Sequence, residues 1–275
     1  MANIDKDTTM CISIAQRPSS FGATLFNSIF GEMGMNWAYK PFRVDAENLS
    51  GAIGGVRALG IRGCGVSMPH KSEVMKYLDK IDAAAKEIGA VNTIVNENGV
   101  LTGYNTDYTG CLNSLNEFSA RPKSVFIYGA GGAARALILA ARLAGAKEIF
   151  IYNRTEEKAA LLCRQFNCTH VRKKGLHLVQ ADAFFNATPI GMVPDVSLSP
   201  VDSAFLERFS IVLDVVTNPL ETKLIAAARA KGKIAIPGYR MAMHQAMAQF
   251  ELYTGKKPPM EFVERKILSI HAAQK

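Results

Sequence analysis

The sequence predicts an α/β protein of two domains, the second with a doubly wound sheet of mostly parallel strands. Short apolar runs alternate with helical segments, which is the pattern of parallel strands joined by right-handed crossovers. A glycine-rich turn at 129–134 stands between an apolar run and a helical segment, as in a Rossmann-type βαβ unit. After Gly238 the pattern is only helical, which predicts that C-terminal helices pack back on the first domain.

The apolar and helical patterns place the elements of the first domain. Strands are expected at 10–15, 37–44 and 65–68, and helices at 22–34, 47–59, 70–78 and 83–88. Asn98 and Gly99 lie between the apolar runs 92–95 and 100–104. An Asn-Gly pair in this position favours the tight turn of a β-hairpin, so we expect a hairpin here.

The second domain is expected to begin near Asp107. Apolar runs at 125–128 and 148–152 flank the helical segment after the turn, and further strands are expected at 183–186, 211–216 and 233–236. Two helices follow, at 240–253 and 259–273. The predicted organisation is a first domain at 1–106, a nucleotide-binding domain at 107–237 and a helical segment at 238–275.

The glycine-rich turn reads Gly-x-Gly-x-x-Ala between a strand and a helix, which is a strong signal for a dinucleotide. Gly129 allows the tight turn, Gly131 lets the backbone approach a pyrophosphate, and Ala134 allows close packing of helix on strand. The helix N-terminus supplies amide donors and the positive end of its dipole. The turn residues expected to contact the cofactor are Gly129, Ala130, Gly131, Gly132 and Ala133.

The next strand ends in Asn153, Arg154 and Thr155, with Lys158 one helical turn further on. An NAD site usually carries Asp or Glu at this point, which accepts from the ribose hydroxyls. A guanidinium instead pairs with a 2′-phosphate, so we expect all four residues to help bind NADP rather than NAD. The alternative interpretation is that Arg154 and Lys158 are the solvated start of a helix.

Composition and charge narrow the class of protein. The chain has 275 residues, 48% hydrophobic and 20% charged, as in soluble globular proteins, and no apolar stretch approaches the length of a membrane helix. With a polar N-terminus, these features predict a cytoplasmic protein with no membrane partner. They leave open whether it is a monomer or homodimer. The five cysteines are scattered and predict free thiols and no metal site.

The net charge of +8 suits an anionic cofactor and an anionic substrate. It could also indicate nucleic acid, but the basic residues are dispersed. The densest basic run, 172–174, has no interleaved aromatic residues to stack on bases, so we expect no nucleic-acid partner.

Three polar segments precede the glycine-rich turn, at 66–71, 89–93 and 103–107. The first ends in Lys71 and the last in Asp107. Reduction of a ketone needs a hydride donor and a proton donor at the oxygen, and a lysine with an aspartate can supply and relay that proton, typically for ~10²–10⁴ in rate. Taken alone, a lysine in the position of Lys71 is more often a solvated helix start, and Asp107 could simply cap the next helix.

Together these segments resemble the shikimate dehydrogenase family. The family pattern Asn-Val-Thr-x-Pro-x-Lys is similar to 65–71, and Gly-Ala-Val-Asn-Thr is intact at 89–93. Asn-Thr-Asp is present at 105–107, Gly-Ala-Gly-Gly-Ala-x-Arg at 129–135, Asn-Arg-Thr at 153–155 and Asn-Ala-Thr-x-x-Gly-Met at 186–192. The last substrate segment of the family is similar to 238–245, so the resemblance covers nearly the whole chain in order.

The resemblance implies reversible hydride transfer between NADP(H) and shikimate or 3-dehydroshikimate, a step of aromatic amino acid biosynthesis. It implies that Lys71 and Asp107 are the catalytic pair. The residues that it implies for binding the substrate, a small anionic cyclic hydroxy acid, are Ser20, Ser67, Asn92 and Gln245. The further cofactor residues that it implies are Thr188, Met192 and Gly238.

The chain departs from the family mainly where the substrate should bind. The second serine of the family's Ser-x-Ser-Pro matches Gly22, although Ser19 is a competing match for the segment. The asparagine of Asn-Val-Thr is Gly65, an expected tyrosine is Thr217 and a glycine of the last segment is Arg240. A hydrogen bond contributes about 0.5–3 kcal/mol, so two or three losses would weaken shikimate use about 10²–10⁴-fold.

These departures predict an intact catalytic pair with a different best substrate, for which quinate, an aminated analogue and another cyclic hydroxy acid are alternatives. Arg240 is either a replacement partner for a substrate carboxylate or a surface residue at a helix start. A non-catalytic ligand sensor on the same fold is a rival, but a sensor has no need of a proton relay. A tetrahydrofolate-dependent dehydrogenase is a second rival, disfavoured by the matches around 89–107.

Overall fold

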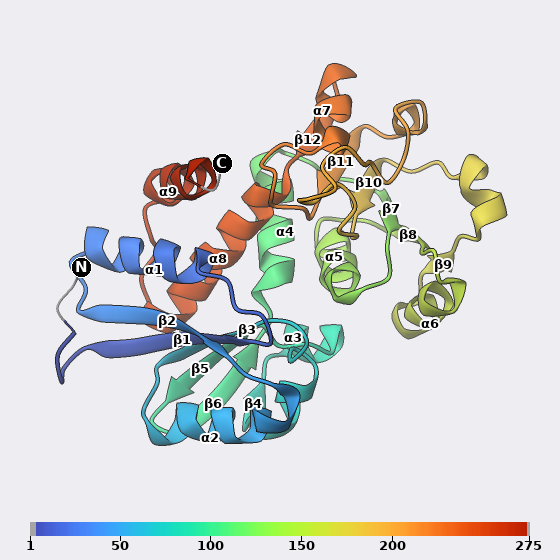
Figure 1. Ribbon diagram of the computed structural model, residues 1–275. Helices are drawn as coiled ribbons and strands as arrows, with labels where there is room; N and C mark the ends of the chain where they lie inside the picture. The colour runs from blue at the N-terminus through green and yellow to red at the C-terminus, as the bar shows by residue number, and fades with distance from the viewer. Residues whose placement is uncertain (1–3, 274–275) are drawn as a thin grey trace. The chain divides into compact units, whose positions relative to one another are not determined.

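The computed structural model describes residues 4–273, which are coloured along the chain in Figure 1. The chain divides into two compact units, Met1–Thr106 with Ala246–Lys275 (unit 1) and Asp107–Gln245 (unit 2). The second boundary lies inside the helix α8 (Gly238–Thr254) and not at its start, so this helix contributes residues to both units.

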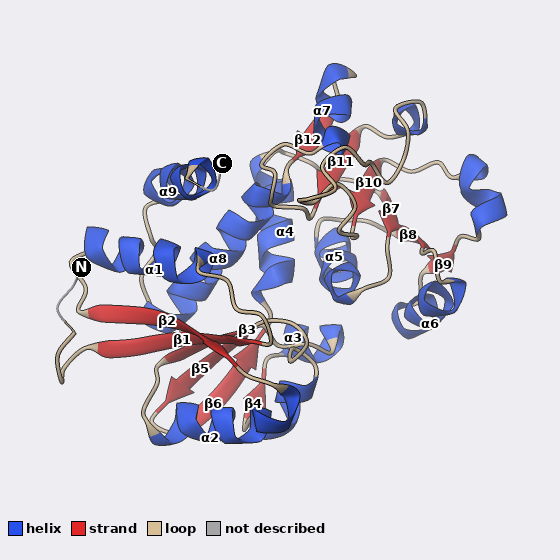
Figure 2. Cartoon of the chain, in the orientation of Figure 1, coloured by secondary structure: helices blue, strands red, loops and turns tan. Residues whose placement is uncertain are grey.

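Unit 1 contains a six-stranded mixed sheet in the order β2-β1-β3-β5-β6-β4 (Figure 2). Strands β1, β2 and β3 are parallel, β5 is antiparallel to both β3 and β6, and β4 is parallel to β6. The strands are β1 Thr9–Ala15, β2 Trp37–Arg43, β3 Gly63–Val66, β4 Lys80–Ile81, β5 Thr93–Glu97 and β6 Val100–Tyr104. The mixed pairing differs from unit 2, where all neighbouring strands are parallel.

The predicted hairpin is confirmed in β5 and β6. Asn98 and Gly99 form its turn with φ values of 54° and 88°, the two positive values that a type I′ turn requires. The register pairs Thr93 with Tyr104 and Glu97 with Val100. The hairpin therefore returns the chain to the same end of the sheet at which Thr93 begins.

Helices cover both faces of the sheet of unit 1. α2 (Leu49–Ala58) packs on one face, where Ile53 belongs to the same buried cluster as Ile12 and Cys64. The other face is covered by α1 (Phe21–Glu32) and the last part of α8, whose Tyr253 ring occupies the space in which a Cβ at Gly63 would lie. α9 (Met260–Ala272) contacts α1, so the C-terminal helices pack back on the first domain, as predicted.

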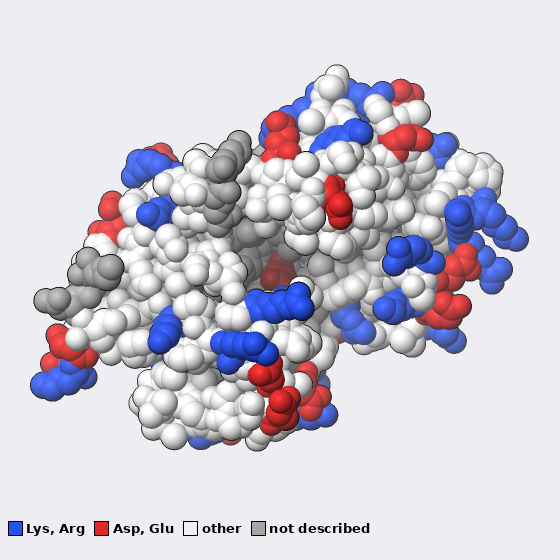
Figure 3. All heavy atoms as spheres, in the orientation of Figure 1, with Lys and Arg blue, Asp and Glu red and all other residues white. Residues whose placement is uncertain are grey.

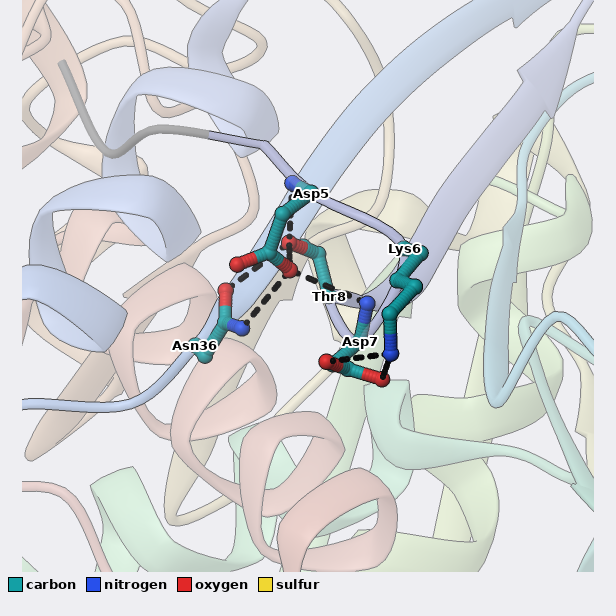
Figure 4. Close-up of polar contacts among 5 residues, drawn as sticks. All are labelled: Asp5, Lys6, Asp7, Thr8 and Asn36. Carbon is teal, nitrogen blue, oxygen red and sulfur yellow. Dashed lines mark hydrogen bonds and ion pairs between the residues drawn. The ribbon is translucent and has the colours of Figure 1, made fainter.

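A polar turn anchors the chain ahead of β1 (Figure 4). Asn36, which precedes β2, donates from Nδ2 to Asp5 Oδ1 at 3.1 Å, and Thr8 Oγ1 lies 2.8 Å from Asn36 Oδ1. Asp5 Oδ1 also accepts from the backbone of Asp7 at 3.0 Å. These bonds connect the approach to β1 with the approach to β2, the two strands that pair along their whole length.

The predicted helix at 70–78 is wrong. The segment forms turns and a short 3-10 helix, Glu73–Tyr77, before it enters β4. Tertiary bonds prevent an α-helix, because the carbonyl of Lys71 accepts from Val91 N at 2.7 Å instead of from the next turn. The two-residue strands β4 and β9 (Thr169–His170) were not predicted, since they are too short to show a pattern.

Unit 2 is a parallel six-stranded sheet in the order β12-β11-β10-β7-β8-β9. The chain builds β7, β8 and β9 towards one edge and then returns to place β10, β11 and β12 on the other side of β7, which is the doubly wound order. The strands besides β9 are β7 Ser124–Tyr128, β8 Glu148–Tyr152, β10 Ala183–Asn186, β11 Ile211–Asp214 and β12 Ile234–Ile236. The predicted Rossmann-type fold is thereby confirmed.

The helices of unit 2 lie on both faces of this sheet. α5 (Gly132–Leu143) and α6 (Glu156–Phe166) share one buried cluster with α4 (Thr106–Glu117). α7 (Lys223–Ala230) packs in a second cluster, which is rich in phenylalanine and includes Phe126 and Phe184. α5 is Ala-rich and fully buried along one side, so the backbone of its first turn lies close to the sheet.

Within residues 4–273, no helix is long and apolar enough to cross a membrane. The same residues contain no group of three His, Cys, Asp or Glu side chains placed to hold a metal ion. All five cysteines are free thiols, as predicted.

Candidate functional site

A pocket of about 250 Å³ opens in unit 2 where β7 and β10 end side by side. In a doubly wound sheet this is the point at which the strand order reverses, and ligands bind there. The residues that line the pocket are Gly129, Ala130, Gly131, Asn153, Arg154, Thr155, Lys158, Ala187, Thr188 and Pro189. Eight of the twelve predicted cofactor residues therefore line this one pocket.

The glycine-rich turn has the geometry that its sequence predicts. Gly129 has φ 121°, and a Cβ there would lie 2.9 Å from the carbonyl oxygen of Ala187. Both the backbone conformation and the close contact therefore require glycine at position 129. Gly131 is extended and stands at the N-cap of α5, and a Cβ on Gly131 or Gly132 would meet nothing within 4 Å. The outer side of the turn is therefore open, with the N-terminus of α5 directed at it.

Asn153 connects the turn to the end of β8. Its Oδ1 accepts from Ala130 N at 3.2 Å and its Nδ2 donates to the carbonyl of Thr155 at 2.9 Å. The Asn153 side chain thus positions the turn. Arg154 and Lys158 are exposed at the rim of the pocket. On the face drawn in Figure 3, basic side chains gather over α6 and the segment after β9, with acidic side chains between them.

The remaining predicted cofactor residues lie in different surroundings. Thr188 lines the pocket, and both its N and its Oγ1 bond to Asn186 Oδ1, at 3.0 and 2.6 Å. Met192 is 44% exposed and Ala133 lies in the first turn of α5, and neither lines the pocket. Gly238 stands at the start of α8, where a Cβ would lie 2.2 Å from the carbonyl oxygen of Val216. Gly238 is thus required for the close approach of α8 to the segment after β11.

A buried carboxyl that the sequence analysis missed supports this end of the sheet. Asp214, the last residue of β11, accepts from Thr222 Oγ1 at 2.6 Å, from Asn186 Nδ2 at 2.9 Å and from Val216 N at 3.0 Å. Burial raises the pKa of this carboxyl. The network fixes the ends of β10 and β11 beside the pocket. In the sequence, its only signal is a charged residue at the end of an apolar run.

In unit 1, three segments interlock around Asn92. Val66 N donates to the carbonyl of Asn92 at 2.8 Å, and Val91 N donates to the carbonyl of Lys71 at 2.7 Å. Asn92 Oδ1 accepts from Thr106 N at 2.7 Å, and Asn92 Nδ2 donates to Thr106 Oγ1 at 3.0 Å. The chain thus brings the segments that carry Lys71, Asn92 and Thr106 together, and Asp107 follows Thr106 directly in the first turn of α4.

The predicted substrate residues are differently placed. Ser20 stands at the N-cap of α1 without a side-chain bond to the helix, while the neighbouring Ser19 accepts from Phe21 N at 3.1 Å. Ser67 is exposed and follows β3. Asn92 is nearly buried, with its carboxamide engaged as described. Gln245 belongs to unit 2 and packs closely on α4, because a Cβ added to Gly110 would lie 2.9 Å from the Cβ of Gln245.

Arg240 matches neither sequence-based expectation. Its side chain is 9% exposed, so it is not a surface residue, and the carboxylate that it binds is that of Glu117 at the end of α4. Arg240 Nη2 pairs with one carboxylate oxygen and Nε bonds to the other at 3.1 Å, while His244 Nε2 lies 2.9 Å from the latter. Sequence analysis could not identify this pair, because Glu117 and Arg240 lie far apart in the chain. It joins α4 to α8 within unit 2.

The Glu117–Arg240–His244 cluster predicts a dependence of stability on pH. Burial, together with the charge of Arg240, lowers the pKa of His244 to about 4, from 6.5. The unfolded chain therefore takes up a proton between pH 6.5 and 4 that the folded chain does not, and the free energy of unfolding falls as the pH falls through this window. The loss reaches up to about 3 kcal/mol near pH 4.

The variant His244→Gln, which keeps an N–H donor for Glu117, is expected to lose less stability across this window than the wild-type protein. Urea unfolding at pH 7, 6, 5 and 4.5 measures the difference. The matched control is His177→Gln, because His177 is exposed. Parallel pH profiles for all three proteins would contradict the prediction.

Comparisons with known proteins agree with the resemblance. Three family models match the chain, described as the shikimate dehydrogenase substrate binding domain (residues 18–94), shikimate / quinate 5-dehydrogenase (113–191) and the shikimate 5′-dehydrogenase C-terminal domain (238–268). A shikimate dehydrogenase-like protein of Haemophilus influenzae is 39% identical over 264 residues, which cover 94% of this chain and 96% of that protein.

Two further relatives carry names that specify a cofactor. A shikimate dehydrogenase (NADP(+)) of Methanothermobacter thermautotrophicus is 40% identical over 89% of this chain and 90% of its own length. The crystal structure of shikimate 5-dehydrogenase from Thermus thermophilus, in complex with NADP(H) and shikimate, superposes with a TM-score of 0.86 at 29% identity, covering 95% of this chain and 99% of that one.

Proposed function

Because the chain belongs to the shikimate dehydrogenase family, we propose that it is an NADP-dependent oxidoreductase that acts on a cyclic hydroxy acid. The reaction is reversible hydride transfer between NADP(H) and the hydroxyl or ketone of a shikimate-type ring. The observation that carries the proposal is the pocket at the end of β7 and β10, where the open side of the Gly131 turn meets two exposed cations.

The residues of this pocket fit NADP. The space beyond Gly131, which a Cβ would enter without meeting protein within 4 Å, lies at the N-terminus of α5, where a pyrophosphate is favoured. Arg154 and Lys158 lie at the rim, where a guanidinium can pair with a 2′-phosphate in two hydrogen bonds. Thr188, held by Asn186, also lines the pocket.

When bound, NADPH supplies the hydride. The ammonium of Lys71 donates a proton to the substrate oxygen as its carbon is reduced, and in the reverse direction the amine takes the hydroxyl proton back. The resemblance to the family pairs Asp107 with Lys71 in this role. The interlocked segments around Asn92 support these roles, because the backbone of Lys71 is bound to Val91 and the residue before Asp107 is bound to Asn92.

The substrate side is the divergent part of the site. In the proposal, Ser20, Ser67 and Gln245 contact the ring acid, while Asn92 chiefly holds the segments together. Glycine at positions 22 and 65 removes two hydrogen-bonding side chains. We therefore expect a ring acid other than shikimate as the best substrate. A purely ligand-sensing protein is disfavoured, since nothing in such a role calls for the lysine and aspartate.

Steady-state reduction of NADP⁺ tests the proposal, with shikimate, quinate, an aminated shikimate analogue and other cyclic hydroxy acids compared side by side. Saturable turnover of at least one ring acid is expected, with shikimate used about 10²–10⁴-fold less efficiently than the best acid. Bound NADP without turnover of any acid would favour the sensor and contradict the proposal. The most efficient turnover with shikimate would contradict only the divergence in substrate.

Arg154→Gln is expected to raise the KM for NADP⁺ about 10–100-fold, because it removes a charged hydrogen bond to the 2′-phosphate. The KM for NAD⁺, which has no such phosphate, should stay the same. The matched control is Arg164→Gln, an exposed arginine of α6 that does not line the pocket. Equal changes for the two dinucleotides would show that Arg154 does not read the 2′-phosphate.

A further inference from the structure

The side chain of Tyr39 fills the space that Gly65 leaves empty in unit 1. An ideal Cβ on Gly65, in β3, would lie 2.8 Å from Tyr39 Oη and 3.3 Å from Ser13 Cβ. A Cβ on Gly22, in α1, would lie 3.7 Å from Tyr39 Cε1 and 3.9 Å from Oη. Both glycines depart from the family pattern, and both face the same phenol ring.

The sheet register explains how Tyr39 reaches Gly65. β1 lies between β2 and β3, with Cys11 paired to Tyr39 on one side and Ser13 paired to Gly65 on the other. Side chains two residues apart on a strand point to the same face, so Tyr39, Ser13 and Gly65 share one face of the sheet. The Tyr39 side chain extends across β1, and its hydroxyl hydrogen-bonds to Ser13.

Tyr39 is held rigidly in this position. Its ring stacks on Phe26 at 4.7 Å with an interplanar angle of 14°, and only 5% of the residue is exposed. Asn27 binds its backbone on both sides, accepting from Tyr39 N at 2.8 Å and donating to Tyr39 O at 2.9 Å. The hydroxyl therefore has a fixed place above Gly65.

A second neutral polar group converges on the same point. Gln249, from the part of α8 that belongs to unit 1, has its Nε2 3.4 Å from the Cβ position of Gly65. The same nitrogen donates to Thr93 Oγ1 at 2.9 Å and lies 3.4 Å from the carbonyl oxygen of Asn92. Gly65 is paired with Thr93, and two residues further along the chain lies Ser67. Tyr39 and Gln249 thus border the segments to which the proposed function assigns substrate contacts.

We propose that Tyr39 determines the substrate specificity of this protein, with Gln249 beside it, in place of a side chain at position 65. The inference rests on the proposed function. The phenol and the carboxamide are both neutral, and a buried charge without a charged partner is costly. The part of the ring acid that meets Tyr39 is therefore an uncharged hydrogen-bonding substituent such as a hydroxyl, and the carboxylate lies elsewhere.

Tyr39→Phe tests the inference, since it keeps the stacked ring and removes only the hydroxyl. The KM of the best ring acid is expected to rise about tenfold, with kcat changed less than KM and the KM for NADP⁺ unchanged. The matched control is Ser13→Ala, which breaks the same Tyr39–Ser13 bond and leaves the Tyr39 hydroxyl in the protein. Its KM for the acid should stay within about threefold of wild type.

Gly65→Ala provides an independent arm. Its Cβ would collide with Tyr39 Oη in the wild-type background, so the KM of the acid should rise and the melting temperature should fall. In the Tyr39→Phe background the colliding atom is absent, and adding Gly65→Ala should cost much less. This loss of additivity is expected because the two positions share one space.

The outcomes separate this inference from the proposed function. Two results would overturn the specificity role of Tyr39 and leave the proposed function standing. One is wild-type turnover of a ring acid that Tyr39→Phe leaves unchanged, and the other is a reduction by Ser13→Ala as large as that by Tyr39→Phe. Additive effects of Tyr39→Phe and Gly65→Ala would count against the shared space. Absence of turnover in wild type with every acid would overturn the proposed function and this inference together.

Discussion

Lys71→Ala is expected to lower kcat for the best ring acid about 10²–10⁴-fold, the usual contribution of a positioned general acid. Binding of NADP⁺ should be unchanged, because the dinucleotide pocket is built from residues of unit 2. The fold should also persist, since the tertiary bond of residue 71 to Val91 is made by its backbone carbonyl, which alanine retains. Stopped-flow and steady-state measurement of NADPH formation, with the melting temperature, provide the three readouts.

Lys76→Ala is the matched control for Lys71→Ala. Lys76 lies in the same segment, is exposed, and pairs with Glu73 at 2.8 Å, a surface ion pair of small energetic weight. Its removal should leave kcat within about twofold of wild type. A Lys71→Ala protein that keeps more than about a tenth of wild-type kcat would show that the proton comes from another group.

The pair Gly131→Ala and Gly129→Ala is expected to separate cofactor binding from folding. Gly131→Ala should weaken NADP⁺ binding about 100-fold and leave the melting temperature of the free protein unchanged. Residue 131 has φ −86°, which alanine adopts freely, and its Cβ would meet no protein atom within 4 Å. The methyl group would instead occupy the space assigned to the pyrophosphate.

Gly129→Ala should act on the fold itself. Alanine at φ 121° is strained, and its Cβ would lie 2.9 Å from the carbonyl oxygen of Ala187, so the free energy of unfolding should fall by about 2–4 kcal/mol. Isothermal titration with NADP⁺ and urea unfolding measure the two effects on the two variants. Tight NADP⁺ binding by Gly131→Ala would place the pyrophosphate away from this turn.

Local sequence patterns were sufficient to predict those parts of the structure that depend on residues close together in the chain. The βαβ unit around Gly129 could be predicted because a strand, a turn that needs glycine and a helix follow one another within a few residues. The hairpin at Asn98 and Gly99 could be predicted because the two positive φ values belong to adjacent residues. The parallel α/β class of unit 2 could be predicted from the same alternation of strands and helices.

The arrangements that the sequence alone could not predict join residues of different secondary-structure elements. Arg240 finds Glu117 only after α4 and α8 have packed together, and residues 70–78 avoid an α-helix only because the segment at 89–92 captures their backbone. In the sequence, Asp214 is only a polar residue at the end of a strand. Its hydrogen bonds to Thr222 and Asn186 are formed in the folded structure.

The sequence by itself thus determined the fold class, because short-range geometry decides it. The resemblance to the family then pointed to Lys71 and Asp107 as the proposed proton-transferring pair. Only the tertiary structure decided how the departures at Gly22 and Gly65 are accommodated. Tyr39 lies on a strand two places away in the sheet, and its side chain reaches Gly65 only when β1 lies between them in register. Neighbours of this kind are set by sheet order and packing, which no local pattern in the chain encodes.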